Sequence, residues 1–344
     1  MSRRSLTLLI ASVGTAVAIA VSVLVPVPYV ILGPGPTLNT LGKDSSGKPL
    51  ITISGRASYP TTGHLNMVTV SYQGCQGDRF NIFTALVAWL NPHQAVVPES
   101  EICPAGQTQK ETQQQDTQQM TSSQQTATAA ALTELGIPYS TQVVVAQADK
   151  GLPAYGVLKA GDVITAVDGK PVTSQASLTR LITSRPAGST LTVTVTRNGQ
   201  SKQVKVGTRE SGGHPVMGVE ITGRYKFPFR VTIRVGDIGG PSAGLMFALG
   251  IIDKLTTLDL TGGKFIAGTG EIEASGKVDA IGGIQQKMVG ARNAGATIFL
   301  TPASNCADAK GAVPAGLRLV KVSTLAQAVS YLKALKTGGT VPSC

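Results

Sequence analysis

An uncharged, apolar beginning limits what this chain can fold into. No charged residue occurs from Ser5 to Gly42, and Leu6–Val25 is predominantly apolar. A run of roughly 20 apolar residues crosses a bilayer as a helix. Arg3 and Arg4 precede the run, and basic flanks stay on the cytoplasmic side. The sequence therefore predicts an uncleaved single-pass anchor (1–33) in the cell membrane, with the bulk of the chain extracytoplasmic. A cleaved signal peptide is the alternative.

The remaining composition is that of a globular protein with more than one folded unit. The chain has 344 residues, 42% of them hydrophobic, which favours two domains plus appendages. Aromatic residues make up 4% and glycines number 40, so the cores should consist of aliphatic side chains between tight turns. The net charge of +11 is scattered and forms no basic stripe with interleaved aromatics, which argues against nucleic acid as a partner. Anionic lipid or a wall polymer fits the charge better.

Four cysteines form an even set, which suits an exported protein with disulfides. Their spacing favours Cys75 with Cys103 and Cys306 with Cys344. The other pairings and free thiols remain open. No Cys/His cluster has the spacing of a zinc site, and we expect no metal and no cofactor.

Four segments organise the first part of the chain after the anchor. The Gly/Pro/Ser-rich stretch 34–47 is typical of a short stem. Partial alternation over Leu65–Ser71 predicts a strand, and Asn81–Leu90 predicts a short apolar helix ended by Asn91-Pro92. The stretch Gln107–Leu135 is rich in Gln, Thr and Ser and contains no glycine or proline, which predicts a long polar-faced helix.

A small, self-contained unit follows from Pro138 to about Thr208. Leu158–Val172 contains two turns around a strand, Leu178–Ser184 has helical periodicity, and Asn198-Gly199 joins two alternating strands. This pattern resembles a PDZ domain of the bacterial protease-associated kind. The resemblance implies a peptide groove between a strand and the Leu178–Ser184 helix, with residues 136–140 as the loop that receives a chain-terminal carboxylate.

The third part contains a candidate nucleophile. Gly240–Gly244 has the pattern Gly-x-Ser-x-Gly ahead of an apolar stretch, with Pro241 at a first helical position and Ser242–Lys254 as the helix. All three histidines precede Ser242, whereas an α/β-hydrolase needs one after its serine. The base is therefore not expected to be histidine. A serine that only caps a helix is the plainer alternative.

Lys287 is the best remaining candidate for the base. It lies in a predicted helix, Ile284–Asn293, beside apolar residues and small ones. Desolvation favours the neutral amine, which can accept a proton near neutral pH. The alternative is a solvated lysine whose stem covers apolar surface.

From about Asp237 to Asn305 the sequence resembles the proteolytic domain of the Lon family of Ser-Lys peptidases. The resemblance rests on four motifs in the family order: Gly240-Pro241-Ser242-Ala243-Gly244, Gly268-Thr269-Gly270-Glu271-Ile272, Ile281–Lys287, and Ala294-Gly295-Ala296 with Pro302 and Asn305. It implies that Ser242 attacks the peptide carbonyl and Lys287 carries the proton. It further implies that Thr269 orients the lysine amine and that amides near Gly240 and Ser242 bind the oxyanion. ATP-dependent members usually have an aspartate where this chain has Gly239, and the nearest aspartate here is Asp237, two residues earlier.

As a whole, the chain resembles the membrane-anchored, PDZ-containing Lon-like proteases of bacteria. The implied fold class is α+β: a transmembrane helix, a PDZ domain shaped as a small barrel-like sandwich (138–209), and a Lon-type domain (214–337) to which residues 34–137 contribute. No P-loop motif occurs, so we expect an ATP-independent serine endopeptidase that cleaves unfolded or flexible proteins, in ring-like homo-oligomers. The alternative is a catalytically silent PDZ scaffold or adaptor at the cell surface.

Overall fold

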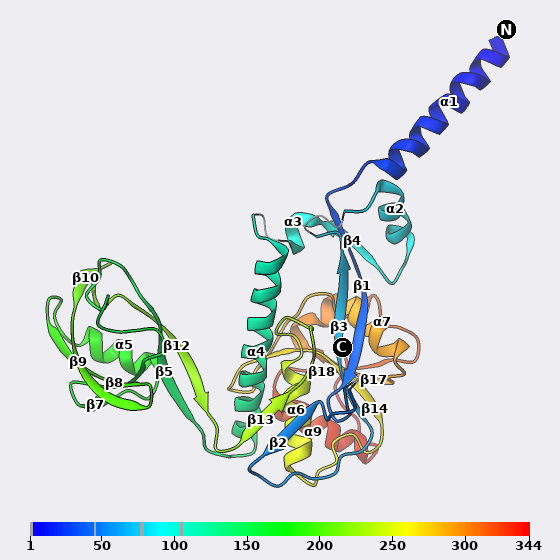
Figure 1. Cartoon of the computed structure of the whole chain (residues 1–344). Coiled ribbons are helices and arrows are strands. Elements are labelled where there is room, and N and C mark those ends of the chain that lie inside the picture. Colours follow the sequence, from blue (N-terminus) through cyan, green and yellow to red (C-terminus); the bar gives the residue numbers. More distant parts are fainter. Residues whose placement is uncertain (1–2, 45, 76–78, 104–105) are drawn as a thin grey trace. The chain divides into compact units, whose positions relative to one another are not determined.

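The computed structural model of the chain describes residues 3–44, 46–75, 79–103 and 106–344 (Figure 1). The chain forms two compact units. Residues 1–136 and 229–344 make the larger unit, and residues 137–228 make the smaller one. The smaller unit is therefore inserted into the sequence of the larger, and each is described separately.

A six-stranded sheet with the order β18-β17-β14-β3-β1-β4 organises the larger unit. The sheet combines strands from before and after the insertion, because β3 pairs in parallel with β14. This parallel pairing extends through β17 to β18, whereas β1 runs antiparallel to both β3 and β4. Its strands are β1 (Tyr29–Asn39), β3 (His64–Gln73), β4 (Ala95–Pro98), β14 (Phe265–Gly268), β17 (Ile298–Pro302) and β18 (Arg318–Val322).

The expectation of a stem over residues 34–47 is wrong, because this stretch contributes to β1. Pro34 pairs with Val70 of β3, and the register shifts between Pro34 and Thr37. Only Tyr29–Leu32 of β1 pairs with β4, so both prolines of the strand lie beyond that ladder, where a missing N–H is tolerated. The Thr69 hydroxyl donates to the Pro36 carbonyl (2.8 Å), which satisfies an acceptor at the irregularity.

Three helices contact this sheet: α6 (Gly244–Leu255), α7 (Ile284–Asn293) and α9 (Leu325–Lys336). A fourth, α4 (Gln109–Glu134), packs on α6 and α9. α7 contacts β1 and β3, and α6 contacts β3 and α4. The predicted long helix is confirmed as α4. It begins with a capping box between Thr108 and Glu111, and it buries its C-terminal alanines and Leu132.

The larger unit also contains shorter elements, some of them predicted. The helix expected at Asn81–Leu90 is α2 (Ile82–Leu90), capped by Asn81. β13 (Arg230–Ile233) pairs with β2 (Ile51–Ser54). The others are α3 (Glu99–Ile102), β15 (Glu271–Ile272), β16 (Val278–Asp279), η1 (Ala303–Asn305) and α8 (Cys306–Lys310).

The predicted apolar N-terminal helix is α1 (Arg3–Leu24), which is long and apolar enough to cross a membrane. None of its residues is buried within the protein. A solvent-exposed helix of this composition has no soluble core to cover it, which is compatible with a membrane anchor.

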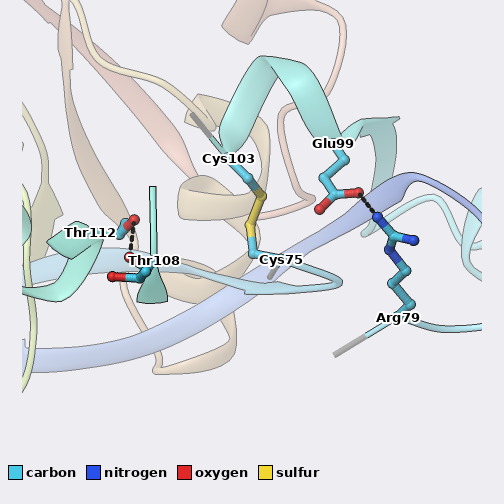
Figure 2. The surroundings of a disulfide bond; sticks show 6 residues. All are labelled: Cys75, Arg79, Glu99, Cys103, Thr108 and Thr112. Atoms are coloured by element: carbon cyan, nitrogen blue, oxygen red, sulfur yellow. Dashed lines mark hydrogen bonds and ion pairs between the residues drawn. A yellow bond between two sulfur atoms is a disulfide. The ribbon is translucent and has the colours of Figure 1, made fainter. Parts of the chain in front are cut away.

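Both disulfides follow the pairing that the cysteine spacing favoured. Cys75 and Cys103 connect the end of β3 to the end of α3, close to the Arg79–Glu99 ion pair (3.6 Å, Figure 2). Cys306 and Cys344 connect α8 to the last residue. The C-terminus is also held by a hydrogen bond from the Lys321 N–H to the Pro342 carbonyl (3.0 Å).

The smaller unit is a sheet with the order β12-β5-β6-β8-β9 and one helix, α5. Aliphatic side chains of β5, β6, β8, β9 and β12 form its core with Leu178 of α5. Its elements are β5 (Ser140–Ala148), β6 (Val163–Val167), β7 (Lys170–Pro171), α5 (Gln175–Thr183), β8 (Thr190–Arg197), β9 (Gln200–Gly207), β10 (Arg209–Ser211), β11 (His214–Val216) and β12 (Val219–Lys226).

The groove of this unit lies beside a strand that the sequence analysis left out. A cavity of about 650 Å³ runs between α5 and the chain from His214 to Ile221, which includes the start of β12. The lining of this cavity includes Met217-Gly218, the segment that enters β12, and not residues 136–140, the expected carboxylate loop. Residues 209–226 carry few large apolar side chains, which is why periodicity did not reveal this strand.

A buried ion pair stabilises the smaller unit. Arg197 donates to both carboxylate oxygens of Asp162 (2.7 and 2.6 Å) and to the Val157 carbonyl (2.9 Å). Asp162 is 1% exposed. Burial raises the pKa of Asp162, but hydrogen bonds from Arg197 and from the Lys159 N–H outweigh it, so the pKa lies below its usual value.

We therefore predict that Arg197→Ala strongly destabilises the smaller unit. Removing the guanidinium leaves the Asp162 carboxylate buried without its partner, which costs about 3–5 kcal/mol. Hydrogen exchange of the full chain, followed by mass spectrometry over β6 and β8, measures the loss as a lower free energy of opening.

Arg185→Ala is the matched control. It breaks the Arg185–Asp168 pair (3.0 Å), in which the arginine side chain is 49% exposed, and should cost less than about 1 kcal/mol. Equal effects of the two substitutions would mean that the buried pair contributes no more than an exposed one.

Candidate active site

Ser242 lies in the turn before α6 rather than in the helix. The predicted helix start at Pro241 is wrong, because α6 begins at Gly244 with Ala243 as its N-cap. The Ser242 carbonyl accepts from the Gly270 N–H (2.8 Å), so the first helical hydrogen bond of α6 runs to Ala243 instead. The serine is thus held at the N-terminal end of α6, the positive end of the helix dipole.

Thr269 holds the backbone of the serine. Its hydroxyl donates to the Ser242 carbonyl (2.9 Å), and the residue is fully buried. We expected the lysine amine as its partner, whereas the hydroxyl proton is directed at the serine carbonyl. Thr269 and Gly270 together fix the turn that presents Ser242.

Lys287 extends from the first turn of α7, next to the central strands. Its N–H donates to the carbonyl of Gly283, the N-cap, which has φ +66°. A Cβ at Gly283 would come within 2.6 Å of the Val70 side chain, so only glycine allows α7 to begin this close to β3. The register of the lysine therefore depends on this contact.

The lysine is buried among apolar groups. It is 4% exposed, and desolvation lowers the pKa of Lys287 from 10.5 to about 8. Burial disfavours the charged ammonium, so the neutral amine is far more populated near physiological pH than in a solvated lysine. A neutral amine can accept a proton, which a solvated lysine does not do at this pH.

Asn305 holds the loop that leads into the lysine helix. Its side-chain amide donates to the Ile281 carbonyl, and its amide oxygen accepts from the Ile281 N–H, both at 2.9 Å. Asn305 is buried. This reciprocal pair fixes the backbone immediately before Gly282-Gly283.

Ser242 and Lys287 line the same cavity, which has a volume of about 440 Å³. Its other walls come from β1, β3, α4 and the loop before Ser242. Most of the lining is apolar, with two carboxylates, Asp116 and Asp237. Burial raises the pKa of Asp116. The two residues that the sequence analysis selected thus line one cavity, together with Asp237.

Helix α4 packs directly on the loop of the serine. The Asp116 carbonyl accepts from the Gly240 N–H (3.1 Å), and the Ser123 hydroxyl donates to the Pro241 carbonyl (2.9 Å). A Cβ at Gly239 would lie 2.4 Å from that of Asp116, so the close approach requires glycine. An aspartate at position 239 could not be accommodated in this packing.

This packing changes the expected oxyanion donors. The Gly240 N–H is already bonded to Asp116 and is not free in this arrangement. Among the residues that the structure describes, no acceptor is found for the Ser242 N–H. That N–H, at the start of α6, is the better-placed donor for a developing negative charge.

The sequence analysis missed the contribution of α4 to the site. Asp116, Met120 and Ser123 follow the spacing of one helix face, and all three contact the cavity or the serine loop. The i, i+4, i+7 spacing of these residues indicates one helix face, but the many glutamines and threonines of this helix made that face hard to recognise.

Comparisons with known proteins identify two domains in the chain. Residues 234–334 match the Lon protease (S16) C-terminal proteolytic domain, and residues 112–208 match a PDZ domain. The chain is 35% identical over 95 residues to a Lon protease of Neorickettsia sennetsu, covering 27% of this chain and 11% of that protein. It is 45% identical over 69 residues to a Lon protease of Clostridioides difficile, covering 20% and 8%. The chain therefore matches about a tenth of the length of these relatives.

Among solved structures, the chain is similar to PDZ domains of SdrC-like proteins. The domain from Listeria monocytogenes is 27% identical, covering 23% of this chain and 85% of that one, with a TM-score of 0.22. The domain from Listeria innocua is 26% identical, covering 23% and 92%, with a TM-score of 0.23. By its sequence matches, this chain carries a PDZ domain and the proteolytic domain of Lon-type proteases.

Proposed function

We propose that the protein is a serine endopeptidase with a Ser242–Lys287 dyad. The observation that carries the proposal is the shared cavity of about 440 Å³, which is lined by both the turn-held serine and the buried lysine. The lowered pKa of Lys287, about 8, supports its use as a base. A lysine that served only to cover apolar surface would keep its ammonium group in water.

In this mechanism the Ser242 hydroxyl attacks the peptide carbonyl while the Lys287 amine takes its proton. The resulting oxyanion is bound by the Ser242 N–H, and the lysine then gives its proton to the leaving amine. Water, deprotonated by the same amine, hydrolyses the acyl-enzyme. Thr269 and Gly270 keep the serine in place by holding its carbonyl.

Gly240 becomes a second oxyanion donor when its N–H leaves the Asp116 carbonyl. One donor typically changes the rate about 100- to 1000-fold, so this exchange has a large effect on turnover. If α4 never releases the loop of Ser242, the Gly240–Asp116 hydrogen bond keeps this donor occupied, which favours the second candidate function, a silent PDZ scaffold. The activity test below decides between the two.

The proposed enzyme works outside the cytoplasm, without ATP, and α1 anchors it in the membrane. α1 is apolar enough to span a bilayer and follows two arginines, which supports this location. The sequence contains no P-loop motif, so substrates must already be unfolded or flexible. A ring-like homo-oligomer is part of the same proposal and rests on the Lon-type resemblance.

The smaller unit binds an extended peptide along β12 in this proposal. β12 ends its sheet within the described residues, and the cavity of about 650 Å³ beside it is bordered by Leu178 and Ile182 of α5. An edge strand beside an apolar helix face accepts a peptide as an added strand. Such binding would recruit substrates or regulate the protease.

We predict that Ser242→Ala and Lys287→Met each abolish cleavage of a chemically unfolded, fluorescently labelled protein. Loss of the nucleophile, or of the base that activates it, should lower the rate by at least about 1000-fold. The full chain in nanodiscs, assayed without ATP, provides the measurement. Cut peptides identified by mass spectrometry give the cleavage specificity.

The matched controls are Ser275→Ala and Lys277→Met, which alter an exposed serine and lysine outside the cavity. Both should cleave as the unmodified chain does. Cleavage retained by Ser242→Ala or Lys287→Met would refute the dyad. No cleavage by the correctly folded, unmodified chain would favour the scaffold.

We also predict that kcat/KM rises with pH and levels off above a midpoint near 8, the pKa of Lys287. Only the neutral amine accepts the proton, so the rate should fall about tenfold per pH unit well below the midpoint. The profile is measured with a small fluorogenic peptide.

Circular dichroism across the same range serves as the control, because the fold should not change between about pH 6 and 9. A midpoint near 10.5, the ordinary value for lysine, would mean that the amine is solvated and contradict the burial argument.

A further inference from the structure

Helix α2 exposes an apolar surface that the proposed chemistry does not use. Its large side chains are between 38% and 69% exposed, with Trp89 the most exposed of them. They are Ile82, Phe83, Leu86, Val87, Trp89 and Leu90. Isolated apolar residues on a surface are ordinary, but six within one nine-residue helix form a patch that water solvates poorly.

The segment around this helix contains no charge. From Phe80 to Pro98 there is no Asp, Glu, Lys or Arg, and the charged residues Arg79 and Glu99 stand at its two ends. These two side chains form an ion pair at 3.6 Å, which brings the two ends of the segment together (Figure 2). Soluble loops of this length normally carry charges, so their absence indicates an apolar environment.

The backbone joins α2 to the end of α1. Pro26, two residues after α1, forms a β-bridge with Asn81, the N-cap of α2. The Val27 N–H donates to the Phe80 carbonyl (3.0 Å), and the helices themselves are in contact. Figure 1 shows α2 beside the C-terminal end of α1. The apolar patch therefore lies where the chain leaves the proposed membrane helix.

The lengths of the two helices suit different places in a bilayer. α1 has 22 residues. At 1.5 Å per residue it extends about 33 Å, enough for the hydrocarbon core. α2 has nine residues. It is only about 13 Å long and cannot span, but it is short enough to remain within the headgroup region beside the exit of α1.

We propose that α2 is a second membrane contact, which lies in the outer interface with Trp89, Phe83 and Leu90 among the lipids. The inference rests on the proposed membrane anchor. Tryptophan is enriched at the bilayer interface because its ring is apolar and its N–H is polar. An amphipathic or apolar helix buries its face about 5–10 Å below the surface, and the contact fixes the protease relative to the membrane.

A second copy of the chain is the competing occupant. The Pro26–Asn81 bridge argues against it, because this bridge keeps the patch beside α1 whether or not copies assemble. If α1 spans the membrane, lipid surrounds the patch in every state of assembly, whereas a second copy is present only in an oligomer.

Trp89 makes the proposal testable, because it is the single tryptophan of the chain. The full chain is reconstituted in phosphatidylcholine–phosphatidylglycerol vesicles and its tryptophan emission is recorded. We expect emission shifted to shorter wavelength, at least a twofold lower quenching constant for iodide than free tryptophan shows, and strong quenching by lipids brominated close to the headgroup.

The control moves the fluorophore to the aqueous part of the same unit. In a Trp89→Phe background, Tyr59→Trp places tryptophan at a position that is 43% exposed and joined through its N–H to the Lys254 carbonyl. Its emission should stay that of a solvated indole, and brominated lipid should not quench it.

The outcomes separate the inference from the proposed function. If the chain fails to float with the vesicles, the membrane anchor itself is wrong and the inference fails with it. If the chain floats but iodide quenches Trp89 freely, the anchor stands and the lipid contact of α2 is refuted. Emission at shorter wavelength without quenching by brominated lipid would also overturn the inference, because a protein interface then covers Trp89.

Discussion

The parallel pairing of β3 with β14 is the contact on which the rest of the larger unit depends. It joins Leu65 to Ile266 across an inserted domain and makes one sheet of two distant segments. Parallel strands require a long crossover, which this chain provides with α4, the smaller unit and α6. Because α7 packs on β3 and β1, the pairing also determines where the lysine helix begins. Without it, Val70 would not contact Gly283, and Lys287 would lose its apolar surroundings.

The chemistry of the site follows from burial more than from any charged partner. Desolvation is the cause of the lowered pKa of Lys287, so the apolar walls of the cavity are what make the amine usable. The serine is treated differently: its carbonyl is held by Thr269 and Gly270, which leaves its N–H at the helix end. The pKa of Lys287 is thus lowered by the exclusion of water, whereas Ser242 is positioned by the hydrogen bonds of its own backbone. Both effects are set by the packing of α6 and α7 against the central strands.

The sequence predicted the local features of this structure well and the long-range ones less well. The helices over Asn81–Leu90 and Ile284–Asn293, both disulfides and the lysine in an apolar setting are all present. Each is set by residues close in sequence or by a strong motif. The strand over Pro34–Asn39 was missed because proline normally weakens a strand, and only the bulge against β3 accommodates it. The roles of Asp116 and of β12 were missed because they depend on neighbours far away in the sequence.

Helix α4 connects these findings, because it lines the cavity and binds the serine loop at the same time. Its hold on Gly240 is one backbone hydrogen bond, which contributes about 0.5–1.5 kcal/mol net. A substrate whose oxyanion accepts from Gly240 gains a charge-assisted bond of about twice that strength. In the proposed mechanism the exchange would therefore be favourable once the tetrahedral intermediate forms, and unfavourable for a neutral ground state. Such an arrangement would bind the transition state better than the substrate, which is the requirement for catalysis.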